Sequence, residues 1–250
     1  MRFMKMRLDV LLAERGYYAS RSKAGEAIKL GLVTVNGCVV TKPAYEADGG
    51  ESIEARAAWK YVSRAGEKLE AALDAFCVDC GGLCALDIGA STGGFTECLL
   101  RRGARTVYAL DVGRDQLDEK IKNDARVISM EGRNARYMHK SDFPQEPELI
   151  TMDVSFIPQE LIYPACAALL APGRKMITLV KPQFEAGKEN VGKGGIVKDR
   201  DGSVLKAILA RVDAAAEAAG FRRDGLIKSP IEGGDGNTEY LAVFTKVREG

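Results

Sequence analysis

From Ser63 to the C-terminal end of the sequence, apolar runs of four to six residues alternate with helical patterns. Strands are expected at residues 84–88, 106–110, 127–130, 149–152, 175–180, 225–228 and 240–245. Helices are expected between most of them, at about 66–76, 94–102, 114–121, 158–170 and 203–219. Such alternation is typical of α/β proteins with a mostly parallel, doubly wound sheet. The pattern therefore predicts a Rossmann-like domain over residues 64–250.

The N-terminal part of the sequence has a different pattern. Apolar spacing predicts two short helices at about 7–15 and 21–29, followed by a hairpin at 32–40. Asn36 and Gly37 suit the type I′ turn of that hairpin, and Ser20 is a good N-cap for the second helix. The stretch 54–61 has no clear hydrophobic period. We therefore predict a small α+β domain at residues 1–58 and a linker at 59–63.

The charges divide unevenly between these two parts, although the net charge of the whole chain is only +1. Residues 1–45 contain eight Lys or Arg and three Asp or Glu, a net of +5, and the remaining residues have a net charge of −4. A basic N-terminal part on a mildly acidic body suggests that a polyanion binds there. A solvated basic helix face is the alternative explanation.

Membrane insertion, secretion and metal binding are not indicated by the sequence. No apolar run approaches the ~18 residues that a spanning helix needs, and the N-terminus lacks the features of a signal peptide. Of the six cysteines, Cys77, Cys80 and Cys84 are close together, but a closed zinc site needs four ligands. We expect a cytoplasmic protein without a metal and without a membrane partner.

The sharpest local signal is the run Leu86-Asp-Ile-Gly-Ala-Ser-Thr-Gly-Gly-Phe-Thr, in which a strand passes through a glycine-rich turn into a helix. Glycines allow the backbone to approach a ligand closely, and a helix N-terminus offers free N–H groups. The spacing matches neither the dinucleotide fingerprint nor a P-loop. It therefore disfavours a pyrophosphate and favours a smaller group, such as the amino-acid end of S-adenosylmethionine.

Asp111 follows the next strand and is placed to accept hydrogen bonds from a ribose diol. A glycine turn followed by such an acid indicates a nucleoside-bearing cofactor, but it does not distinguish NAD from S-adenosylmethionine. The alternative role of Asp111 is to cap the helix expected after it.

Four further charged residues stand next to expected elements. Lys68 lies at the start of a helix, Asp153 and Lys181 each follow a strand, and Glu239 precedes the last strand. The carboxyl ends of parallel strands meet at the crevice where ligands bind. Glu239 reaches that edge only if the last strand is antiparallel. For any one of these residues taken alone, a surface ion pair is the preferred explanation.

Two resemblances connect these features. The last ~185 residues resemble the FtsJ-type ribose 2′-O-methyltransferases in Ser63-Arg-Ala-Gly-Glu-Lys-Leu, in Asp87-Ile-Gly-Ala-x-x-Gly-Gly-Phe and in the order of Lys68, Asp153, Lys181 and Glu239. The first ~55 residues resemble the α-L RNA-binding domain in Arg7-Leu-Asp-x-Leu-Leu, Ser20-Arg-Ser-Lys-Ala and Gly31-Leu-Val-x-Val-Asn-Gly. The two parts in this order are similar to the TlyA family, also labelled haemolysin A.

The resemblance implies an enzyme that uses S-adenosylmethionine to methylate the ribose 2′-oxygen of cytidines in 16S and/or 23S ribosomal RNA. The implied catalytic residues are Lys68, Asp153, Lys181 and Glu239. The expected cofactor-binding residues are Asp87, Gly89, Ala90, Ser91, Thr92, Gly93, Gly94, Phe95, Asp111, Val112, Asn134 and Asp153. The expected RNA-binding residues are Arg7, Arg21, Lys23, Lys29, Lys188 and Lys193.

Several details stay open at this stage. Lys181 is expected to contact the 2′-oxygen, as a base if neutral or as a stabiliser of the oxyanion if charged. Asn134 is expected to contact adenosine, or else to cap a helix. Ser91 and Thr92 stand where Ala-Pro is usual in the FtsJ-type loop, which is expected to alter the loop and not the cofactor. The glycine-rich basic stretch 188–198 is expected to meet RNA phosphates, with a plain surface loop as the alternative.

The partner is expected to be ribosomal RNA or a ribosomal subunit, and the protein is expected to be a monomer. Three competing functions remain: a methyltransferase of proteins or small molecules, a membrane-active haemolysin, and an NAD oxidoreductase. The basic N-terminal part disfavours the first, the lack of a lytic segment disfavours the second, and the missing fingerprint disfavours the third.

Overall fold

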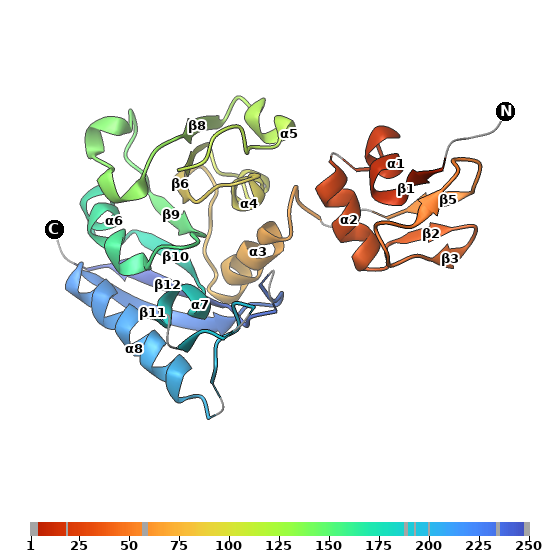
Figure 1. The fold of residues 1–250 in the computed structure, drawn as a ribbon. Coiled ribbons are helices and arrows are strands. Elements are labelled where there is room, and N and C mark those ends of the chain that lie inside the picture. Colours follow the sequence, from red (N-terminus) through yellow and green to blue (C-terminus); the bar gives the residue numbers. More distant parts are fainter. Residues whose placement is uncertain are drawn as a thin grey trace. The chain divides into compact units, whose positions relative to one another are not determined.

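The computed structural model describes residues 5–18, 20–56, 60–187, 190–192, 194–199, 201–233 and 236–247. Contacts divide the chain into two compact units, Met1–Lys60 and Tyr61–Gly250. Each unit has buried hydrophobic clusters of its own. Figure 1 shows the helices and strands of both units.

The first unit packs two helices against short strands. Its elements are β1 (Met6–Arg7), α1 (Leu8–Glu14), α2 (Arg21–Lys29), β2 (Val33–Val35), β3 (Cys38–Val39), β4 (Glu46–Ala47) and β5 (Ile53–Ala55). Leu8, Leu12 and Ile28 are fully buried in its core. Asn36 and Gly37 both have positive φ angles, 51° and 77°, which confirms the expected turn between β2 and β3.

The stretch 54–61, which has no clear hydrophobic period in the sequence, begins within a strand. Glu54 and Ala55 belong to β5, which pairs antiparallel with β2. Strand β1 likewise pairs with β4 and was not expected. These strands have two or three residues each, which is too short for an alternating pattern to stand out in the sequence.

The second unit is built on a seven-stranded sheet with the order β11-β12-β10-β9-β6-β7-β8. The strands are β6 (Cys84–Ile88), β7 (Thr106–Asp111), β8 (Val127–Glu131), β9 (Leu149–Met152), β10 (Lys175–Val180), β11 (Phe221–Lys228) and β12 (Tyr240–Lys246). Strands β6 to β10 pair in parallel, whereas β12 runs antiparallel to both of its neighbours. The expected fold class, including the reversed last strand, is therefore confirmed.

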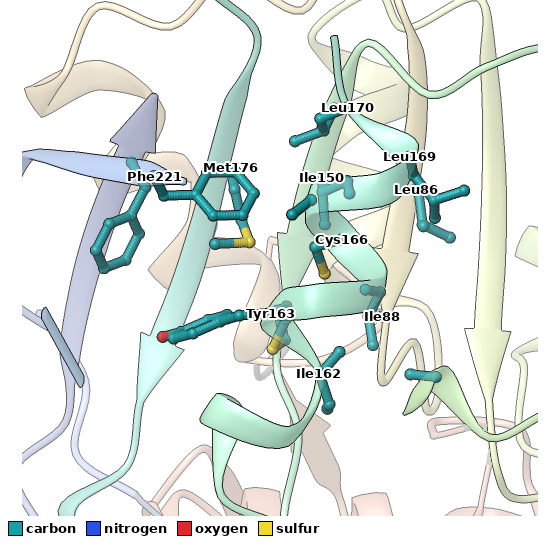
Figure 2. Close-up of a cluster of buried hydrophobic side chains, with 14 of the residues drawn as sticks. Leu86, Ile88, Ile150, Ile162, Tyr163, Cys166, Leu169, Leu170, Met176 and Phe221 are labelled. Carbon is teal, nitrogen blue, oxygen red and sulfur yellow. The ribbon is translucent and has the colours of Figure 1, made fainter. Parts of the chain in front are cut away.

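Helices cover both faces of this sheet. They are α3 (Ala65–Ala75), α4 (Gly94–Arg101), α5 (Glu119–Lys122), α6 (Tyr163–Leu169), α7 (Pro182–Glu185) and α8 (Ser203–Ala218), with short 3-10 turns η1 (Ala135–Tyr137), η2 (Lys140–Asp142) and η3 (Gln159–Leu161). One buried cluster joins α3 and α4 to the sheet. The other joins α6 and α8 to the opposite face, where Cys166 of α6 lies near Ile150 (Figure 2).

Two expected helices differ from the structure. Instead of a helix over 114–121, α5 begins only at Glu119, because Gln116 and Leu117 donate their backbone N–H groups to the Glu131 side chain. The helix expected over 158–170 is divided into η3 and α6, and Pro164 stands in the first turn of α6. A proline is tolerated in that first turn but breaks a helix interior.

In the part of the chain that the structure describes, no helix is long and apolar enough to span a membrane. The same part contains no group of three or more His, Cys, Asp or Glu side chains that could hold a metal ion. Cys77 is exposed, whereas Cys80 and Cys84 are buried. Burial raises the pKa of Cys80 to about 11, so this thiol is a weak nucleophile and a weak metal ligand.

Candidate functional site

The glycine turn after β6 lies directly against the residues that follow β9. Gly89 has a φ of 80°, and a Cβ atom added to it would stand 2.3 Å from the backbone oxygen of Asp153. Gly93 is also left-handed, with a φ of 92°, and α4 begins at the next residue. Glycine is required at Gly89 by conformation and by contact, because any side chain would push the turn away from Asp153.

Asp87 lies beneath this turn and is not exposed to solvent. It is fully buried in β6 and accepts hydrogen bonds from Thr96 Oγ1 at 2.6 Å and from Thr151 Oγ1 at 3.0 Å. Burial raises its pKa to about 7, against the opposing effect of the two threonines. Asp87 therefore ties together β6, α4 and β9 at the point where the turn begins.

Asp111, at the end of β7, holds the turn from the other side. Its Oδ2 accepts the backbone N–H of Ser91 at 2.8 Å, and its Oδ1 accepts that of Gly113 at 2.7 Å. No helix begins directly after it, since α5 starts at Glu119. Asp111 therefore orders two loops and does not cap a helix.

A cavity of about 410 Å³ opens beside the turn. Six of the twelve residues expected to bind a cofactor line it: Gly89, Ser91, Asp111, Val112, Asn134 and Asp153. Six others are absent from its lining: Asp87, Ala90, Thr92, Gly93, Gly94 and Phe95. Asn134 also caps η1, because its side chain accepts a hydrogen bond from the backbone N–H of Arg136 at 3.0 Å. Asn134 therefore both lines the cavity and caps a turn of helix.

Sequence reasoning missed several residues of the cavity wall. Gln116, Arg133, Ser155, Phe156, Ile157 and Ile162 also line it. Phe156 has a φ of 64° and is 89% exposed, and its ring lies 4.8 Å from that of Phe184. A bulky residue is rarely left-handed or so exposed, and such features concentrate at functional sites. No local sequence signal predicts that backbone angle.

Two of the four expected catalytic residues form an ion pair at the cavity. Lys181 Nζ lies 2.5 Å from Asp153 Oδ1 and 3.0 Å from the hydroxyl of Ser155. The Lys181 and Asp153 side chains are 13% and 17% exposed. Asp153 Oδ1 is buried and, apart from this ion pair, accepts no hydrogen bond from the described residues. The pair is therefore partly accessible and has unused acceptor capacity.

The other two form a second, buried pair. Lys68 Nζ of α3 lies 2.5 Å from Glu239 Oε2, and these side chains are only 6% and 3% exposed. Val180 pairs with Tyr240 in the antiparallel register, so Lys181 and Glu239, the next residues outward, leave the sheet at the same edge. The structure thus brings all four residues to the carboxyl edge of the parallel strands, as two pairs of unequal accessibility.

The expected RNA-binding residues that can be described belong to the first unit. Arg7 and Arg21 both contact Asp9, Lys29 is exposed and Lys23 is half-buried. Lys188 and Lys193 lie outside the described residues.

Comparison with known proteins agrees with this arrangement. Residues 61–246 match the FtsJ-like methyltransferase family, and residues 6–53 match the S4 domain. Hemolysin A of Brachyspira hyodysenteriae is 47% identical over 96% of this chain and 99% of its own length. The Mycobacterium tuberculosis 16S/23S rRNA (cytidine-2′-O)-methyltransferase TlyA is 39% identical over 95% of this chain and 88% of its own length.

A solved structure from Streptococcus thermophilus that carries a hemolysin name is also similar. It has a TM-score of 0.78 and 43% identity, and the match covers 99% of this chain and 90% of that one. The family match covers the whole second unit, including the glycine turn and both ion pairs. The chain therefore belongs to the family of FtsJ-like methyltransferases and has an S4 domain at its N-terminus.

Proposed function

We propose that the protein transfers a methyl group from S-adenosylmethionine to the ribose 2′-oxygen of cytidine in ribosomal RNA. One observation carries this proposal: Lys181 contacts Asp153 and Ser155, and both of these residues line the cavity next to the glycine turn. A nucleoside-sized cavity and a cation that can meet a hydroxyl oxygen are what such a transfer needs, since alignment supplies much of the acceleration.

The residues of the cavity fit S-adenosylmethionine. When bound, this cofactor supplies an activated methyl group on a positively charged sulfur. Asp153 lines the cavity beside the glycine turn, and a carboxylate at this place suits the ammonium of a methionine group. Each oxygen of Asp111 accepts one backbone hydrogen bond, and a carboxylate oxygen can accept a second from a ribose hydroxyl.

In this proposal the two ion pairs have different tasks. Lys181 donates a hydrogen bond to the 2′-oxygen and orients this oxygen. Asp153 and Ser155 hold the side-chain ammonium of Lys181 in position. The Lys68–Glu239 pair is too buried to meet the substrate directly. It holds α3 and the start of β12 in place, so that the edge carrying Lys181 is rigid.

Two features support RNA as the substrate. The first is the match of residues 6–53 to the S4 domain. We propose that this match lies in a domain of residues 1–58, which is joined through 59–63 to a catalytic domain of residues 64–250. Phe156, exposed at the cavity, offers a ring on which a base turned out of its helix can stack. The name of the Mycobacterium tuberculosis relative supports cytidine as the nucleoside.

Transfer of tritiated methyl groups to ribosomal RNA from a strain that lacks the enzyme tests the proposal, followed by mapping of ribose methylation. The wild type should label cytidine riboses, and Lys181→Ala should not. Lys175→Ala is the matched control, because Lys175 pairs with Asp224 at 3.0 Å at the opposite end of the same strand. Label on a base, or full activity of Lys181→Ala, would refute the proposed reaction.

A further inference from the structure

In helix α1, Asp9 is a buried carboxylate that contacts two arginines. Arg7 donates from Nε to Oδ1 at 3.0 Å and from Nη2 to Oδ2 at 2.9 Å. Arg21 donates from Nε to the same Oδ2 at 3.0 Å. The bonds from Arg7, followed by those from Arg21, lower the pKa of Asp9 to about 2 despite its burial. One carboxylate thus orients two guanidinium groups on one small surface.

The backbone around this cluster is fixed by regular structure. Arg7 lies in β1 and is paired with Glu46 of β4. Arg21 is the first residue of α2, whose N-terminus is capped by Ser20. Helices α1 and α2 pack against each other in the core of the unit. Three elements therefore bring the cluster together, and its geometry belongs to the fold.

Both arginines keep donors that face away from Asp9. Their side chains are 46% and 59% exposed for Arg7 and Arg21. A guanidinium has five N–H donors, of which Arg7 gives two and Arg21 one to Asp9. Neither arginine side chain makes another hydrogen bond within the described residues. Two cations and one anion leave the cluster with a net charge of +1.

The resemblance to an RNA-binding domain already implies that Arg7 and Arg21 bind RNA. We propose that Asp9 is the positioning residue that holds both guanidinium groups so that they contact one phosphate group together. Guanidinium forks match phosphate oxygens in geometry and charge. Without Asp9 the two cations would repel each other and adopt many rotamers, so a phosphate would have to gather them on binding. The inference rests on the proposed function, because it takes RNA as the ligand.

Asp9→Asn separates this inference from simple electrostatics. The substitution removes a negative charge, so attraction by net charge alone predicts tighter binding of RNA. If Asp9 positions the arginines, binding should instead weaken, roughly tenfold for one charge-assisted phosphate contact. The salt dependence of log K should also become shallower by about 0.7 to 0.9. Glu14→Gln, at an exposed residue of the same helix, removes the same charge and should leave binding unchanged or tighter.

The measurement is filter binding of ribosomal RNA, from a strain that lacks the enzyme, to the full chain over a range of salt concentrations. Arg21→Gln alters an exposed side chain and should also weaken binding roughly tenfold. Asp9→Asn should have no weakening effect in an Arg7→Gln/Arg21→Gln background, since the groups that Asp9 positions are then gone.

Three results would overturn the inference. In the first, Asp9→Asn binds RNA with the same affinity as Glu14→Gln. In the second, Arg21→Gln has wild-type affinity for RNA. In the third, Asp9→Asn still weakens RNA binding in the Arg7→Gln/Arg21→Gln background. The third result would show that Asp9 affects binding only through the stability of the unit. The double-arginine background therefore separates a positioning role of Asp9 from a folding defect of Asp9→Asn. A wild type that methylates ribosomal RNA while any of these results holds leaves the proposed function intact. A wild type that binds no ribosomal RNA overturns both.

Discussion

At the scale of single residues, Asp87 makes the stability around the glycine turn depend on pH. Burial raises its pKa to about 7, whereas in the unfolded chain it titrates near 3.9. Between these values the folded state binds more protons than the unfolded state, so this group's contribution to stability is present below pH 4 and is lost as the pH rises through 7. Asp87→Asn removes that loss, because an amide stays neutral.

The expected result is a pH-dependent difference between Asp87→Asn and the wild type. At pH 8 the variant should gain stability, by a few kcal/mol at most, and at pH 4 the two should be equally stable. Urea unfolding of both proteins at several pH values measures the difference. Parallel curves over the whole range would show that the Asp87 carboxylate is already ionised when buried.

The buried Lys68–Glu239 pair allows stability and activity to be separated. Lys68→Met alone leaves the Glu239 carboxylate buried without its partner, which should cost about 3–5 kcal/mol of unfolding free energy. The double variant Lys68→Met/Glu239→Leu should recover most of that loss, because two apolar groups need no partner. If the pair positions the catalytic edge, the double variant should still transfer methyl groups slowly. Wild-type turnover in a stable double variant would assign the pair to folding alone.

At the scale of elements, a set of hydrogen bonds links the two segments that carry the cavity. Gln159 Nε2 donates to the backbone oxygen of Leu179 at 2.7 Å, and the backbone N–H of Gln159 donates to Glu185 Oε1 at 3.0 Å. These bonds connect the segment after Asp153 to both sides of Lys181. The Tyr163 hydroxyl also donates to Gln159 Oε1 at 2.8 Å. The side chains of Gln159, Glu185 and Tyr163 are all buried.

Gln159→Leu should loosen this wall of the cavity. The substitution leaves a buried carbonyl and a buried hydroxyl without partners, at about 1–3 kcal/mol each. The KM for S-adenosylmethionine should rise severalfold, since Asp153 and Phe156 lie on the freed segment. Tyr163→Phe is the control, because it removes one hydrogen bond and keeps the link between segments. Equal kinetic effects in both variants would contradict a specific role for Gln159.

The elements that sequence predicts best are those whose signal is long and apolar. Strands β6, β9 and β10 have the predicted bounds, because buried parallel strands read as continuous apolar runs. Helix α7 was not predicted, since four residues are too few for a helical period. The cavity residues Gln116 and Phe156 were missed for a different reason. They reach the site through loop conformations that tertiary contacts impose, and the sequence does not show which residue of each loop turns toward the cavity.

At the scale of the whole molecule, the two units differ in net charge. The first unit, residues 1–60, has a net charge of +3, and the second unit, residues 61–250, has a net charge of −2. If the protein acts on RNA as proposed, the RNA should be attracted more strongly to the first unit than to the second. Affinity should then depend on where a positive charge is removed, and not only on how many are removed.

Two pairs of substitutions with the same change in net charge test this division. Lys23→Gln/Lys29→Gln lies in the S4 domain, and Lys206→Gln/Lys228→Gln changes two exposed lysines of the catalytic unit. The first pair should raise the KM for ribosomal RNA and flatten its salt dependence by about 0.7 for each phosphate that is no longer neutralised, while kcat at saturating RNA stays unchanged. The second pair should leave both quantities close to wild type. Equal reductions of affinity in the two double variants would mean that RNA responds to the net charge of the protein as a whole, and the division of tasks between the units would have to be abandoned.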